Sequence, residues 1–141
     1  MSTILLLILA TILWGVWGIA DKLALNHAHP YTVQWMYAIP YVLALPLWYW
    51  LGNRIQPETN HSLPAFGWAV FAGGASMLAL ILLLFALQGQ SASLVVAFTS
   101  AYPFVTLFLA VLLRMEKISI QQVLGMVLII GGLVLLQWQR S

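Results

Sequence analysis

Hydrophobic residues fill long runs along this chain, and short polar or proline-containing stretches separate the runs. A helix needs about 20 mainly apolar residues to cross the hydrocarbon core of a bilayer. Runs of about that length predict five transmembrane helices, at residues 4–25, 31–51, 65–87, 91–113 and 118–138. We therefore expect an all-α, polytopic membrane protein in which the 141 residues form one five-helix domain.

Composition strengthens the membrane prediction and excludes several other classes of protein. Charged residues make up 6% of the chain and hydrophobic residues 63%, with a mean hydropathy of +1.00, whereas about 25% of a soluble domain is charged. There is no cysteine, so disulfides and thiol catalysis are excluded. No catalytic set, phosphate-binding loop or basic cluster is visible, so we expect neither an enzyme nor a nucleic-acid partner nor a cofactor. His27, His29 and His61 lack further ligands, so no metal site is predicted.

The few charges give almost no signal for orientation in the membrane. Five crossings place the two termini on opposite sides. Arg54, Arg114 and Lys117 then share the side of the N-terminus, and Lys22 and Arg140 lie on the other side. Lys and Arg favour the cytoplasmic side, and an excess of one charge predicts either insertion in both orientations or a weak but sufficient bias. The sequence does not decide between them.

The first predicted helix carries the most unusual side chains. Tryptophan normally lies at the membrane interface, yet Trp14 and Trp17 are near the middle of residues 4–25. They predict either a cavity wall that contacts a solute or indoles that fill space beside glycine-mediated helix contacts. Asp21 and Lys22 are charged residues near the end of the same helix. They are either functional or, for Lys22, an anchor that extends to the interface.

The fourth and fifth predicted helices carry the other candidate features. Thr99, Ser100 and Tyr102 form a polar patch beside Pro103. Such a patch lines a cavity or, alternatively, bonds to carbonyls of its own helix. In the fifth helix, Gly125, Gly131 and Gly132 form a surface suited to close helix contact, either within the chain or with a second copy. Ser119 followed by Gln122 predicts a capping box at the start of that helix.

Three sequence patterns, taken in order, resemble a single EamA-type domain of the drug/metabolite transporter superfamily. Trp14-Gly15 with Lys22 resembles the first-helix pattern of that family. The second pattern runs through Phe85-Ala86-Leu87-Gln88, Ser91-Ala92-Ser93 and Pro103. The third comprises Glu116, Ser119, Gln122, Gly125 and Gly132. The resemblance covers nearly the whole chain.

The resemblance implies a fold of two inverted five-helix repeats, of which this chain supplies one. A transporter of this kind then requires an antiparallel homodimer, which dual insertion would provide. It also implies alternating access to a central cavity by a small metabolite or drug-like solute. We expect Trp14, Trp17, Thr99, Ser100 and Tyr102 to contact the solute, in a chain surrounded by lipid in a bacterial or archaeal cytoplasmic membrane.

Two alternatives remain open at this stage. The first alternative is a non-transporting membrane subunit that packs against an unrelated protein through its glycine faces. The second alternative is a cation/proton antiporter similar to the small multidrug resistance family, whose members use a glutamate near the middle of the first helix. Here Trp14 occupies that region and the nearest acid is Asp21, which weakens this alternative.

Overall fold

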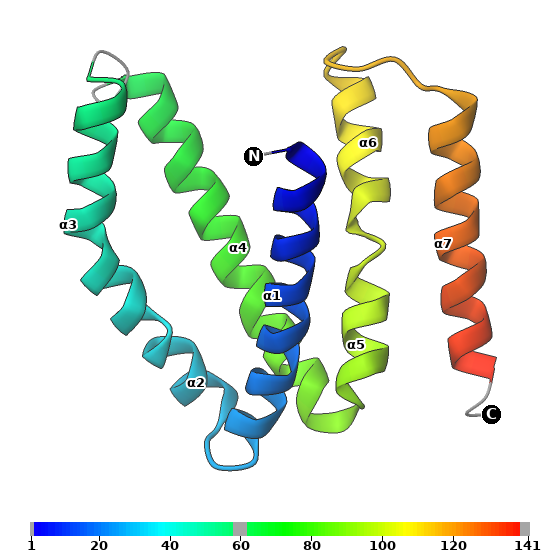
Figure 1. Ribbon diagram of the computed structural model, residues 1–141. Helices are drawn as coiled ribbons and strands as arrows, with labels where there is room; N and C mark the ends of the chain where they lie inside the picture. Colours follow the sequence, from blue (N-terminus) through cyan, green and yellow to red (C-terminus); the bar gives the residue numbers. More distant parts are fainter. Residues whose placement is uncertain (1, 58–61, 139–141) are drawn as a thin grey trace. The chain divides into compact units, whose positions relative to one another are not determined.

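The computed structural model describes residues 2–57 and 62–138, and all of their regular structure is α-helical (Figure 1). Each of the five predicted hydrophobic segments forms helix, but the second and the fourth are each divided into two. The helices are α1 (Thr3–Leu25), α2 (Pro30–Met36), α3 (Ala38–Ile55), α4 (Leu63–Gly89), α5 (Ala92–Thr99), α6 (Tyr102–Leu112) and α7 (Ile120–Trp138).

The second segment divides at Tyr37, three residues before Pro40. Proline has no backbone N–H, so Pro40 cannot donate to the carbonyl of Met36, where α2 ends. Pro30 starts α2, a position at which the missing donor costs nothing. Pro46 lies inside α3 without ending it. The structure thus shows a break before one proline and continuous helix at the other.

The fourth segment divides at Ser100 and Ala101, just before Pro103. The ring of Pro103 removes the hydrogen bond to the Thr99 carbonyl and crowds it, so α5 ends at Thr99. The turn is tight, because the amides of Ser100 and Ala101 donate to Ala97 O and Phe98 O at 3.1 and 3.2 Å. Helix then resumes with Pro103 in the first turn of α6.

Three helical stretches within the described residues are long and apolar enough to cross a membrane. They are Thr3–Leu25, Leu63–Gly89 and Ala92–Leu112, the last comprising α5 and α6 together. Residues Ile120–Leu136 of α7 form a shorter apolar helix. The chain is thus a multi-pass membrane protein, and crossing by α3 and α7 remains a prediction.

The chain folds as two compact units, one of which comprises Ile19–Gly89. In this unit α2 packs against α4. Its core consists of Pro30, Val33, Leu84 and Leu87, all buried. Most other large apolar side chains are exposed, such as Leu43 at 74%. That surface suits contact with lipid.

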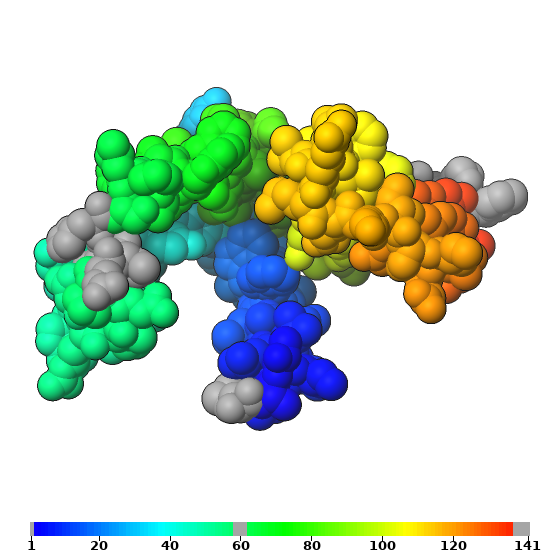
Figure 2. Space-filling model, turned by 90° about the horizontal axis from the view of Figure 1, so that it is seen from above, coloured from blue at the N-terminus to red at the C-terminus, as the bar shows by residue number. Residues whose placement is uncertain are grey.

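The other unit comprises Met1–Gly18 and Gln90–Ser141, and its described residues include most of α1 and all of α5, α6 and α7. Here α5 contacts α7, and α6 and α7 lie side by side (Figures 1 and 2). Val95 of α5 is buried, at 6% exposed. The prediction of a single five-helix domain is not tested by this division and stays a prediction.

Two local motifs determine how α6 ends and α7 begins. Arg114 has a φ of 57°, the left-handed conformation that usually follows a helix C-terminus and that glycine adopts most easily. The amides of Arg114 and Met115 donate to Val111 O and Ala110 O, the pattern of a Schellman motif. The predicted capping box is confirmed: Ser119 N donates to Gln122 Oε1 at 2.9 Å, and Gln122 N to Ser119 Oγ at 3.2 Å.

Candidate functional site

The five residues expected to contact a solute all belong to the unit of Met1–Gly18 and Gln90–Ser141. Thr99 and Ser100 lie at the break between α5 and α6, and Tyr102 begins α6. The break is near the middle of the apolar stretch Ala92–Leu112. Backbone that is not helical is tolerated at membrane depth only where protein buries it or where it lines a water-filled cavity. The break is therefore a position at which polar groups can face a solute.

The hydroxyl groups at this break bond to carbonyls of their own helix. Thr99 Oγ1 donates to Val95 O and Val96 O at 3.1 and 3.0 Å. Ser100 Oγ donates to Val96 O at 2.8 Å. The sequence predicted such bonds to the same helix as the alternative to a cavity lining. They satisfy the hydroxyl protons. Each oxygen retains lone pairs that can accept a hydrogen bond from a donor group of a solute.

The α1 tryptophans are placed relative to this break by one close helix contact. A Cβ atom added at the buried Gly18 would lie 2.9 Å from Val96 Cγ2, so α1 and α5 approach closely there. The two helices run in opposite directions (Figure 1). One turn back from Gly18 is Trp14, and one turn on from Val96 is Ser100, so both lie at a similar level. Trp14 is 58% exposed and Tyr102 56%, which leaves both available for contact.

Asp21 and Lys22, the two charged residues of α1, lie in the other unit and have separate partners. The carboxylate of Asp21 accepts a hydrogen bond at Oδ1 from the Tyr37 hydroxyl. The ammonium group of Lys22 donates to the carbonyl of Leu87. Leu87 is in the last turn of α4, where helix carbonyls lack partners and the helix dipole favours a cation. In the structure Lys22 therefore caps α4, and a role toward a solute stays a prediction.

An aromatic cluster joins the start of α2 to α4 within the same unit. The rings of His29 and Tyr31 each lie beside Phe85, with centroid distances of 5.8 and 5.3 Å and nearly perpendicular planes. His29 Nδ1 also accepts the Tyr31 amide at 3.4 Å. His29 is thus part of packing and capping here. Within the described residues no group of three or more possible metal ligands occurs, and His61 lies outside those residues.

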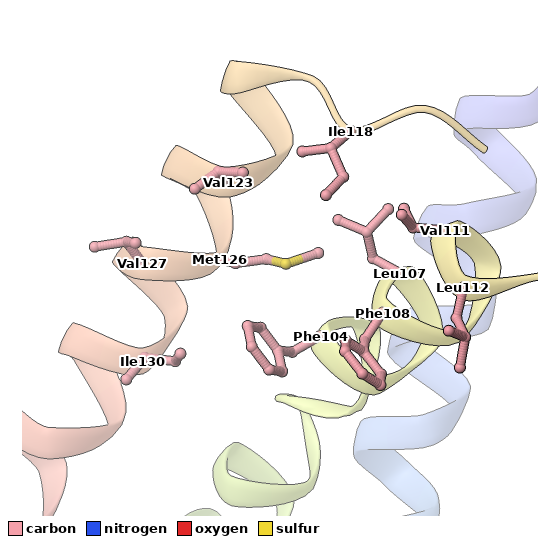
Figure 3. Close-up of a pocket in the computed structure, with 10 residues that line it drawn as sticks. All are labelled: Phe104, Leu107, Phe108, Val111, Leu112, Ile118, Val123, Met126, Val127 and Ile130. Carbon is pink, nitrogen blue, oxygen red and sulfur yellow. The ribbon is translucent and has the colours of Figure 1, made fainter. Parts of the chain in front are cut away.

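An apolar groove of about 360 Å³ lies between α6 and α7. Figure 3 shows Phe104 and Phe108 of α6 facing Met126 of α7 across it. On α7, the glycines Gly125, Gly131 and Gly132 would each accept a Cβ atom with nothing within 4 Å. The glycine surface is therefore not used for a close contact by the described part of this chain. It remains open to lipid or to another chain.

Two polar residues of the unit Ile19–Gly89 were not predicted from the sequence. Tyr37 is the partner of Asp21, and Gln34 in α2 has a buried Oε1 atom. A signal for Gln34 was present, because an amide side chain within an apolar segment is unusual. Tyr37 had none, because its pairing with Asp21 spans 16 residues and depends on how the chain turns between α1 and α2.

Comparison with known proteins supplies the family. The family model described as "EamA-like transporter family" matches residues 1–138. No curated protein and no solved structure matches the chain.

Proposed function

Since the chain belongs to the EamA-like transporter family, we propose that it carries a small metabolite or drug-like solute across the membrane by alternating access. The observation that supports this most is the break between α5 and α6 near the middle of an apolar stretch. Secondary transporters commonly build solute sites from discontinuous helices near the bilayer midplane. The family is a transporter family rather than an enzyme family.

The proposed solute site consists of the break and the nearby face of α1. Ser100 and Thr99 offer acceptor oxygens there, and Tyr102 offers a phenol. Trp14 and Trp17 add large planar surfaces that suit an organic solute. A solute with both a hydrogen-bond donor and an apolar or planar part fits this set best.

We propose further that all five hydrophobic segments cross the membrane. At about 1.5 Å per residue, the 19 residues of α7 span about 28 Å, close to the bilayer core of about 30 Å. Together α2 and α3 extend over residues 30–55, which is ample even with a bend at Tyr37. The bacterial or archaeal cytoplasmic membrane is the proposed location.

Two observations support assembly as an antiparallel homodimer. The Lys and Arg residues on the two sides differ by one, which suits insertion in both orientations. The glycine surface of α7 is open, and surfaces of this kind let membrane helices approach closely. Arg140, one of the counted charges, lies outside the described residues.

The transport proposal is tested with purified protein in liposomes. The liposomes are loaded with an unlabelled amino acid, sugar or organic cation, and uptake of the same labelled solute is followed. We expect protein-dependent exchange for at least one class. Absence of exchange for every class, with and without ion gradients, would contradict transport of these solutes.

The dimer proposal is tested by terminal labelling, because the chain has no cysteine. Ser2→Cys and Ser141→Cys are made separately and labelled with a membrane-impermeant thiol reagent in intact and then permeabilised cells. We expect each terminus to be about half accessible from outside, because the two orientations of a dual-topology chain are nearly equal in number. One terminus wholly outside and the other wholly inside would exclude the antiparallel homodimer.

The open glycine surface also fits a second candidate function, a non-transporting subunit that packs against an unrelated membrane protein. Purification from native membranes distinguishes the two. A single unrelated protein in equal amount, combined with no exchange in liposomes, would favour the subunit.

A further inference from the structure

Asp21 is buried to an extent that is rare for a charged residue. Its side chain is 3% exposed, and it is the one buried charged residue among those the structure describes. Tyr37 donates to Oδ1, whereas Oδ2 is buried without a hydrogen-bond partner. A buried carboxylate with an unpaired oxygen is costly, and an ionisable residue inside a membrane helix is a functional candidate by default.

A second unpaired acceptor comes from the helix that approaches Asp21. Gln34 Oε1 is buried without a partner, like Asp21 Oδ2. Gln34 precedes Tyr37 by three residues, so their side chains lie on adjacent turns about 5–6 Å apart at Cβ. Gln34 is therefore the amide side chain of α2 that lies one turn from the residue bonded to Asp21. We call Asp21 Oδ2 and Gln34 Oε1 the acceptor pair.

The chemistry of the acceptor pair restricts what can bind there. Both atoms are acceptors, so a bound species must supply a hydrogen-bond donor or a positive charge. Hard metal cations take about six or more oxygen ligands, and the described residues offer two unpaired ones. A proton fits better. Once on Oδ2 it neutralises the carboxylate and makes that oxygen a donor, which is the group that an unpaired acceptor such as Gln34 Oε1 requires.

The other charged and titratable groups around Asp21 are few. Lys22 adjoins it in α1 and donates to the Leu87 carbonyl, and Tyr37 faces it from the end of α2. At the start of α2, His29 packs on Phe85. The sequence of α4 contains no Asp, Glu, Lys, Arg or His. In α3 the one charged residue is Arg54, about 26 Å farther along the helix than Tyr37.

We propose that Asp21 reversibly binds one proton at Oδ2, with Tyr37 donating to Oδ1 and Gln34 accepting from the protonated oxygen. The proton comes from water and returns to water, so no bond other than O–H forms or breaks. The use of this site, to couple solute movement to a proton gradient, rests on the proposed transport function. The binding itself does not.

The sequence allows Asp21 to be observed without mutation, because it is the only aspartate in the chain. Aspartate carrying ¹³C at its side-chain carboxyl carbon is incorporated biosynthetically. The protein is then reconstituted in liposomes without solute. Isotope-edited infrared spectra then distinguish the protonated carboxyl from the carboxylate. We expect both forms to be observed, with the protonated band converting to the carboxylate band as the pH is raised.

Gln34→Leu tests the geometry, because it removes the acceptor of the protonated form while preserving apolar bulk. We expect its conversion at a pH at least about one unit lower, a tenfold loss of proton affinity. Gln121→Leu, on the exposed surface of α7, should leave the conversion unchanged. The same conversion in Gln34→Leu and wild type would remove Gln34 from the site.

Three outcomes would overturn the proposal. Asp21 ionised at every pH, or protonated at every pH, would show that no reversible binding occurs. Loss of the protonated band on adding sodium at constant pH would identify a metal cation site instead. Because these spectra need no solute, they are independent of the exchange assay. A titrating Asp21 in a protein that exchanges nothing would leave the proton site standing and the transport proposal refuted.

Discussion

The close contact between Gly18 and Val96 allows a sharp prediction for Gly18→Ala. The added Cβ would lie 2.9 Å from Val96 Cγ2, whereas carbon atoms pack at about 3.5–4.0 Å. At least about 0.6 Å of movement is therefore needed. Valine in a helix has one strongly preferred rotamer, so Val96 cannot yield easily. Overpacking of this kind costs about 1–3 kcal/mol.

Gly15→Ala is the matched control, one turn earlier in the same helix. A Cβ atom at Gly15 meets nothing within 4 Å. Replacing glycine by alanine inside a helix gains about 0.8–1.0 kcal/mol from propensity, and both variants receive this gain. We therefore expect Gly15→Ala to be neutral or stabilised, and Gly18→Ala to be less stable than it by about 1–3 kcal/mol.

The assay is equilibrium unfolding of purified protein in mixed micelles with increasing sodium dodecyl sulfate, followed by helical circular dichroism. Val96→Ala in the Gly18→Ala background completes a double-mutant cycle, because it removes the clashing methyl group. We expect a coupling energy of at least about 1 kcal/mol, as for residues in direct contact. Equal stability of the two single alanine variants, with no coupling to Val96, would refute close packing of α1 on α5.

The remaining predictions concern the start of α7 and the candidate solute site. Ser119→Ala removes the cap of α7, because the backbone amide of Gln122 loses its hydrogen-bond partner. The free energy of unfolding should fall by about 0.5–2 kcal/mol in the same assay. An unchanged midpoint would mean that the cap contributes nothing to stability. Trp14→Ala should lower solute exchange per folded protein well below that of Trp48→Ala, a similarly exposed tryptophan in α3. Equal exchange by the two variants would remove Trp14 from the site.

The sequence was sufficient to locate the helices because long apolar runs have few alternatives in a membrane. It was not sufficient to locate the two breaks. A proline deletes one donor, and whether the helix then bends or stops depends on how neighbouring backbone groups are satisfied. Pro46 and Pro103 illustrate the two outcomes, since α3 continues through the first and α5 stops before the second.

The site residues differ in how far sequence could place them. The hydroxyls of Thr99 and Ser100 were identified as a patch, and their bonding to Val96 O was one of the two stated alternatives. The sequence placed Asp21 near the end of a helix but did not predict that its side chain is buried. Burial depends on α2 folding back so that Tyr37 reaches it, and no local pattern encodes that contact.

The residue at the left-handed turn, Arg114, affects both backbone strain and membrane orientation, and the two favour different residues there. A non-glycine residue in this conformation costs about 1–2 kcal/mol, so glycine is the residue that would most relieve it. With the proposed five crossings, Arg114 is also one of three cations on the N-terminal side, against two on the other. A glycine there would make the count two against two. Engineering for stability that places glycine at this turn would therefore stabilise the end of α6. It would also remove the small difference in positive charge between the two sides.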